Sequence, residues 1–120
     1  MKLDFGLLFL RVSSGLLMLP HGWSKLSGFT AKMNTFPDPL GISSQASLTG
    51  AVFAEFFCAI LLVLGIKTKW VTIPLIFTML VAAFVVHASD PWNKKEFPLL
   101  YAVIFATLTM TGGGKFSIKE

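Results

Sequence analysis

Two ionisable residues interrupt long apolar segments, and each is a candidate for chemistry. Arg11 lies in an apolar segment near the N-terminus, and Glu55 lies in a second such segment that would run the opposite way. A charge at bilayer depth costs about 2.5 to 3.5 kcal/mol even on the mildest scale, so each residue requires a partner. Because a helix rises about 1.5 Å per residue, the two residues fall at similar depth. We therefore predict that Arg11 and Glu55 form an ion pair inside the membrane.

The neighbours of Glu55 favour an inward position for its side chain. Glu55 belongs to a stripe of small residues spaced for one helix face, where a second backbone can approach closely. The stripe consists of Ala51, Ala54, Glu55, Cys58 and Ala59. Two interpretations stay open. The pair fixes only helix pairing and register, or Glu55 exchanges protons and Arg11 attracts anions beside a small cavity.

A second polar group is expected at the opposite end of the helices. It consists of His21, Lys25, His87 and Glu96. Two imidazoles with nearby carboxylates could exchange protons with a quinone, hold a small anion or bind a divalent metal. The histidines lack the H-x-x-x-H and H-E-x-x-H spacings of strong metal motifs. We predict no metal site and assign no catalytic residue.

The same group also has a plain structural interpretation. Histidines can lie at the membrane interface, and a lysine can extend its charge from the apolar region to water. Glu96 follows Asn93 by three residues, which is the spacing of a capping box at a helix N-terminus. Under this interpretation the group terminates helices and binds nothing.

The composition indicates the kind of elements that position these residues. Of the 120 residues, 54% are hydrophobic and only 13% are charged, and the mean hydropathy is +0.74. A soluble protein of this length would leave much of that apolar surface exposed, so we expect the lipid bilayer to be the main solvent. The net charge of +4 comes from lysines at the ends of apolar runs rather than from a patch, which argues against nucleic-acid binding.

Four apolar segments approach the length of about 20 residues that a spanning helix needs. We predict an all-α membrane protein in which residues 1–120 form one domain, a four-transmembrane-helix antiparallel bundle. A tight turn at 65–69 makes the second and third helices neighbours, and the glycines at 112–114 end the fourth. The long connection at about 22–46 is expected to lie on the membrane surface. The predicted helices cover about residues 3–21, 47–66, 70–88 and 96–111.

The lysines give a weak preference for one orientation. An even number of spans puts both termini on one side, and that side carries five lysines against four. The two sets are Lys2, Lys67, Lys69, Lys115 and Lys119 against Lys25, Lys32, Lys94 and Lys95. The positive-inside rule then favours cytoplasmic termini. The small-residue faces allow packing within the chain or in a homo-oligomer.

The ionisable residues of the apolar segments stand in short motifs that follow one another in a definite order along the chain. The first-helix arginine precedes His21-Gly22-Trp23-Ser24-Lys25-Leu26, and Glu55 leads into Ala59-Ile-Leu-Leu-Val-Leu-Gly65. His87 after Ala82-Ala83, Glu96 before the fourth helix, and Thr111-Gly-Gly-Gly-Lys-Phe-Ser117 complete the order. Over nearly the whole chain this order resembles the DoxX family. The resemblance implies a multi-pass protein of the bacterial inner membrane and groups the six polar positions without assigning their roles.

The resemblance also implies a functional setting. Relatives include subunits associated with electron transfer from thiosulfate to quinone, and proteins linked to oxidative and thiol stress. The chain carries no flavin, haem or iron–sulfur motif, so an electron-transfer role would require a bound quinone or a soluble or membrane partner protein. We expect an accessory or quinone-facing subunit of a redox or sulfur/oxidative-stress system. The alternatives are a small proton or solute carrier and a membrane scaffold without chemistry.

Overall fold

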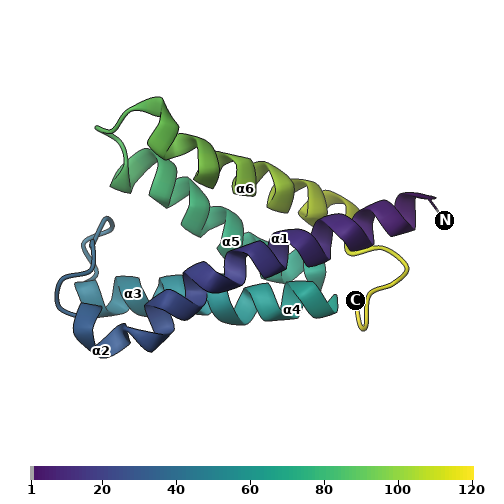
Figure 1. The fold of residues 1–120 in the computed structure, drawn as a ribbon, viewed down its shortest axis with the longest axis horizontal. Helices are drawn as coiled ribbons and strands as arrows, with labels where there is room; N and C mark the ends of the chain where they lie inside the picture. The colour runs from purple at the N-terminus through teal and green to yellow at the C-terminus, as the bar shows by residue number, and fades with distance from the viewer. Residues whose placement is uncertain (1) are drawn as a thin grey trace.

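Four long helical rods make up most of residues 2–120, the part of the chain that the computed structural model describes (Figure 1). Two of the rods contain a stretch of π-helix, marked η. In chain order the elements are α1 (Lys2–Ser27), α2 (Phe29–Lys32), α3 (Ser44–Val52), η1 (Phe53–Cys58), α4 (Ala59–Leu64), α5 (Thr68–Val81), η2 (Ala82–Val86) and α6 (Trp92–Thr111). Within residues 2–120 the β-structure is limited to one isolated bridge.

Three rods are long and apolar enough, by length and composition, to cross a membrane. Within the described chain they are α1, the continuous rod from α3 to α4, and the continuous rod from α5 to η2. With 20 residues, α6 would be about 30 Å long, but its first turns carry two lysines and a glutamate. The chain is therefore an all-α membrane protein, as predicted, and a fourth crossing by α6 stays a prediction.

The second rod begins and ends at residues suited to those positions. Ser43 is the N-cap of α3, and its hydroxyl accepts a hydrogen bond from the amide of Ala46 at 3.1 Å. At the other end, Gly65 has a φ of +75° and terminates α4 in the left-handed conformation that glycine adopts without steric cost. Only two residues separate Gly65 from the start of α5 at Thr68, so the second and third rods are antiparallel neighbours.

The rods meet at one end of the molecule and diverge toward the other. Both chain termini lie at the closed end, where the turn around Gly65 also lies, and the loop 33–43 lies at the open end (Figure 1). α5 packs along α6, and α1 packs along the second rod. A Cβ atom on Gly22 would collide with the backbone of Glu55 and Phe56, and one on Gly15 would lie 3.2 Å from the carbonyl of Ala59. These glycines let α1 approach the second rod closely.

The segment after α6 seals the closed end. Ile66 and Lys119 form the isolated bridge, and the amide of Lys67 donates to the carbonyl of Lys119 at 2.8 Å. The Glu120 carboxylate accepts from the amides of Thr68 at 2.9 Å and Gly113 at 3.0 Å. The last residues therefore cap the start of α5 and tie it to the end of α6.

Several helix limits differ from the predicted ones. α1 continues to Ser27 instead of ending near residue 21, and Pro20 lies inside it. Lipid-embedded helices tolerate an internal proline when neighbouring groups satisfy the backbone. α6 begins at Trp92 with Pro91 as its N-cap, and no side chain caps it. The predicted capping box of Asn93 and Glu96 is therefore wrong, because Asn93 already lies within the first turn.

Candidate functional site

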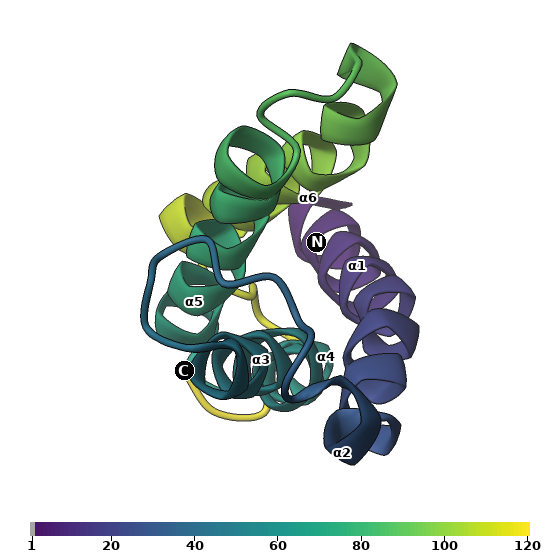
Figure 2. The same cartoon turned by 90° about the vertical axis from the view of Figure 1, so that its left-hand side faces the viewer.

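A cavity of about 630 Å³ occupies the open end of the molecule. Residues from all four rods and from the loop 33–43 line it, and most of them are apolar. The polar side chains with ionisable groups on its walls are those of His21, Lys25, Glu55, His87, Lys94 and Tyr101. The loop arches across this end of the molecule between α2 and α3 (Figure 2) and contributes Phe36 and Leu40 to the lining.

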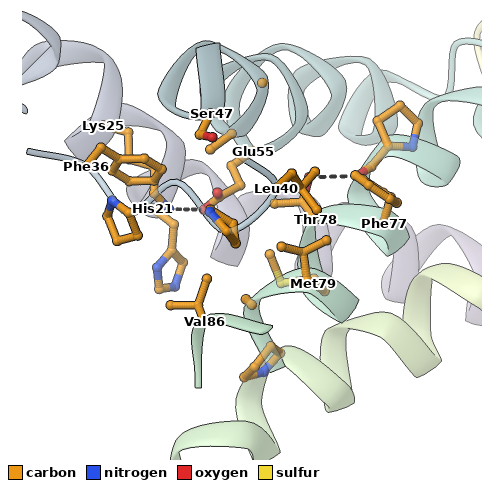
Figure 3. A pocket seen from close by; sticks show the side chains of 18 of the residues that line it. His21, Lys25, Phe36, Leu40, Ser47, Glu55, Phe77, Thr78, Met79 and Val86 are labelled. Carbon is orange, nitrogen blue, oxygen red and sulfur yellow. Dashed lines mark hydrogen bonds and ion pairs between the residues drawn. The ribbon is translucent and has the colours of Figure 1, made fainter. Parts of the chain in front are cut away.

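Lys25 and Glu55 form an ion pair on the cavity wall. Lys25 Nζ lies 2.6 Å from Glu55 Oε1, and the side chains are 24% and 4% exposed. Figure 3 shows the two side chains pointing toward each other from different rods. Because the carboxylate is almost fully buried, the ammonium group compensates a charge that would otherwise be costly at this depth.

Both stretches of π-helix border the cavity. Glu55 lies in η1, and His87 follows η2, where its amide donates to the carbonyl of Ala82 at 3.0 Å. In a π-helix the hydrogen bonds span five residues, and such turns are frequent at functional sites. In η1 the residues Ala54, Glu55 and Cys58 are buried, so this π-helical segment holds Glu55 on the inner side of its rod.

His87 is oriented by a carboxylate. Its Nδ1 lies 2.7 Å from Asp90 Oδ2, three residues further along the chain. An ionised carboxylate only accepts hydrogen bonds, so Nδ1 is the donor, and in the neutral ring Nε2 is then the acceptor. The His87 side chain is 34% exposed, so the ring can contact both the cavity and the solvent. The ring of His21 contacts that of Tyr101 edge-on, with centroids 6.2 Å apart.

Arg11 lies at the closed end and is not part of this cavity. Its side chain is buried, and its guanidinium donates to the carbonyls of Leu62 at 3.3 Å, Val63 at 3.2 Å and Phe116 at 3.3 Å. The positive group therefore sits at the carboxyl end of α4, where the helix dipole favours a cation. Its hydrogen bonds therefore go to backbone carbonyls, and among the described residues its buried Nε has no hydrogen-bond partner.

The predicted ion pair between Arg11 and Glu55 is therefore wrong. The prediction assumed a first helix that ends near residue 21, but α1 runs to Ser27 and brings Lys25 within reach of Glu55. The contact of Gly22 with the backbone of Glu55 sets the register of the two rods. Arg11 is three helical turns away from Gly22 on α1, at about 3.6 residues per turn.

The structure brings together three of the four residues predicted for the outer cluster. His21, Lys25 and His87 line the cavity, whereas Glu96 is exposed on α6 and does not. Glu55, which the sequence assigned to the other site, joins them. The signal that could have shown this is the helical spacing from Met18 through His21 to Lys25, continued past Pro20.

The small-residue stripe around Glu55 is buried, as predicted. It faces α1 inside the chain, where Gly15 and Gly22 approach it. Among residues 2–120 no three His, Cys, Asp or Glu side chains are grouped as metal ligands would be.

Asp38 organises the loop over the cavity. Its carboxylate accepts hydrogen bonds from the amides of Ile42 at 3.0 Å and Ser43 at 2.9 Å, and from the hydroxyl of Ser47 at 2.9 Å. Desolvation acts to raise the pKa of Asp38, but the hydrogen bonds from Ser47, Ser43 and Ile42 outweigh it and hold the pKa below its ordinary value. The loop is thus fastened to the start of α3.

The fold and the site together define a class of protein, a multi-pass helical membrane protein with a cavity at one end of its helices. The chain belongs to the DoxX family, whose sequence model matches residues 6–88. The matched region contains Arg11, His21, Lys25, Glu55 and His87, and it ends before α6. Comparison with curated proteins and with solved structures gave no match.

Proposed function

We propose that this chain is a quinone-facing accessory subunit of a redox or sulfur/oxidative-stress system in the bacterial inner membrane. The observation that supports this best is the ion pair on the cavity wall, since the other lysine of the lining, Lys94, is exposed at the start of α6. Lys25 and Glu55 place one charge of each sign 2.6 Å apart on otherwise mainly apolar walls. Such a lining suits a neutral molecule with a flat apolar body and polar oxygens better than a free ion, and a quinone is a molecule of this kind.

The size and the donors of the cavity fit a quinone ring. Its volume of about 630 Å³ falls within the range of about 300 to 1,000 Å³ of small-molecule sites. Lys25 uses one of its three N–H donors on Glu55, so the others can donate to a quinone carbonyl oxygen. Phe36 and Leu40 supply apolar surface on the side of the cavity that holds this pair, and Phe77 supplies it further away (Figure 3).

The chain also holds groups that can move protons. A bound quinone would accept two electrons from a partner protein and two protons. His87 is kept in one orientation by Asp90, so its Nε2 can exchange a proton with a ligand while the exposed edge of the ring contacts water. The carboxylate of Glu55, held in place by Lys25, is a second group that can exchange a proton with a ligand in the cavity.

The closed end of the molecule argues against a path through the chain. Arg11 and the segment that ends at Glu120 seal that end with hydrogen bonds to the backbone. A carrier would have to open these contacts in each cycle, whereas a ligand site with one opening needs no such change.

Binding of a short-chain ubiquinone to the purified chain in lipid nanodiscs tests this proposal. We expect saturable quenching of tryptophan fluorescence. We also expect at least about tenfold weaker binding in Lys25→Met and Glu55→Gln, because hydrogen bonds to charged groups contribute most of the polar recognition. Lys69→Gln, which removes an exposed lysine at the closed end, is the matched control and should bind normally.

The alternatives give different results in the same preparations. Absence of saturable quinone binding by the wild-type chain would refute the quinone proposal. Proton or solute flux into liposomes without any quinone or electron donor would instead indicate a carrier. Normal assembly with a partner after Lys25, Glu55 and His87 are all neutralised would indicate a scaffold.

The proposed orientation, with both termini in the cytoplasm, has its own test. Lys119 lies at the closed end with the termini, and Lys32 lies at the open end. In whole cells, a membrane-impermeant thiol reagent should label Lys32→Cys and leave Lys119→Cys unlabelled. The reverse pattern would show that the termini face outward.

A further inference from the structure

A second pocket adjoins the main cavity at the end of α1. It measures about 470 Å³ and lies between the last turns of α1, the short helix α2 and the first residues of the loop. Its lining consists of Pro20, His21, Ser24, Lys25, Lys32, Thr35, Phe36 and Pro37. Four of these residues also line the main cavity, so the two spaces share a wall.

The side chains that line this pocket carry a net charge of about +1 once the pairing of Lys25 with Glu55 is counted. None of its lining residues is a carboxylate. The charge of Lys25 is balanced by Glu55, which belongs to the main cavity. The nearest acidic residue along the chain, Asp38, has its carboxylate engaged by the amides of the following turn. Lys32 therefore provides the net charge, and within residues 2–120 it has no carboxylate partner.

Lys32 is held in a fixed position. Its Nζ donates to the carbonyl of Ser24 at 3.2 Å and to the hydroxyl of Ser24 at 3.3 Å. These two bonds leave one N–H of the ammonium group for a ligand. The imidazole of His21 and the hydroxyl of Thr35 on the same lining can supply further donors. The set is suited to the oxygens of a singly charged oxyanion.

The position of the pocket relative to the membrane indicates where such an anion would come from. The pocket lies at the end of the membrane-spanning α1, next to Trp23, which is 57% exposed. Exposed tryptophans concentrate at the level of the lipid headgroups. Pro20, Phe36 and Pro37 add apolar surface to the same pocket, which can contact the carbons next to a lipid phosphate.

We propose that this pocket binds the phosphodiester group of an anionic phospholipid, with Lys32 as the charged contact. A phosphodiester carries a single negative charge, which matches the single net positive charge of the pocket. Basic pockets beside membrane helices are established sites for lipid headgroups. A bound lipid would cover the wall that this pocket shares with the main cavity, through His21 and Lys25. This inference does not depend on the identity of the ligand in the main cavity.

Native mass spectrometry of the full chain with added dioleoylphosphatidylglycerol tests the proposal. We expect one retained lipid, no retained dioleoylglycerol, and about tenfold weaker retention in Lys32→Gln, the effect of losing one charge-assisted hydrogen bond. Lys32→Arg should retain the lipid. Lys69→Gln removes the same charge at the closed end and should behave as wild type. If Lys32→Gln loses helicity, Thr35→Val gives a second test with the charge intact and should also weaken retention.

Two results would overturn the proposal. Equal retention in Lys32→Gln and Lys69→Gln would show that the lipid is attracted by overall charge and not by this pocket. Displacement of the lipid by its deacylated headgroup, glycerophosphoglycerol, at equal concentration would show a site for a soluble phosphodiester, because the acyl chains would then contribute nothing.

Discussion

The cation on which Glu55 depends can be identified with two double-mutant cycles. Lys25 Nζ lies 2.6 Å from the Glu55 carboxylate, which is almost fully buried, whereas Arg11 binds backbone carbonyls at the other end of α1. One cycle combines Lys25→Met with Glu55→Gln, and the other combines Arg11→Met with Glu55→Gln. The structure predicts that only the first pair of substitutions is coupled.

The expected magnitudes follow from burial and contacts. Residues in direct contact show coupling energies of about 0.5 to 3 kcal/mol, and this short and mostly buried pair should give about 2 kcal/mol. Arg11→Met by itself should cost about 3 kcal/mol, because three hydrogen bonds to a charged group are lost while its desolvation cost is removed. Distant sites without shared partners add within about 0.5 kcal/mol, so the second cycle should close within that limit.

The free energy of unfolding can be measured by titrating sodium dodecyl sulfate into the detergent-solubilised protein and following helicity by circular dichroism. Each cycle requires the wild type, two single variants and the double variant under identical conditions. Coupling of about 2 kcal/mol between Arg11 and Glu55, with none between Lys25 and Glu55, would refute the register of α1 described above.

Three further predictions concern packing, pH and helix capping. Gly22→Ala should lower the free energy of unfolding by roughly 2 kcal/mol, because the new methyl meets backbone, whereas Gly50→Ala, with nothing within 4 Å of the added carbon, should have little effect in the same titration. The hydrogen bonds to the Asp38 carboxylate should stabilise the loop fully at pH values above the unfolded pKa of Asp38, and this stability should be lost as the pH falls through the lowered folded pKa. Amide hydrogen exchange of Ile42 should therefore become faster in acid, and unchanged exchange would contradict the prediction. Glu120→Gln should weaken the cap on α5 and cost about 1 kcal/mol, so an unchanged midpoint of thermal unfolding would contradict the cap.

The positions of the apolar segments and the inward faces could be predicted from the sequence. Hydropathy locates the second and third rods and the start of the first to within a few residues, because lipid requires long apolar helices. The burial of Ala54, Glu55 and Cys58 follows from the spacing of small residues among large ones. His21 and His87 were placed at the same end of the bundle by counting spans, and they do line one cavity.

The partners of the charged residues could not be predicted. Ion pairing depends on which turns of two helices lie side by side, and that register is set here by Gly22 against the backbone of Glu55. The first helix was predicted to end near residue 21, six residues before its end at Ser27, and Lys25 was assigned to the outer cluster instead of to Glu55. The backbone carbonyls that accept hydrogen bonds from Arg11 could not be predicted either, because every helix end has unpaired carbonyl groups whatever its side chains are.

The π-helical turn η1 has a consequence for comparing this chain with its relatives. A π turn holds one residue more than an α turn, so it amounts to a single-residue insertion inside a continuous helix. Deleting one residue between Phe53 and Cys58 would restore an α-helix. Leu62 would keep facing the core that it now fills, but the residues inside the turn, Glu55 among them, would point in new directions. A relative whose alignment shows a one-residue gap at this point should therefore have a differently shaped cavity, even where its charged residues are the same.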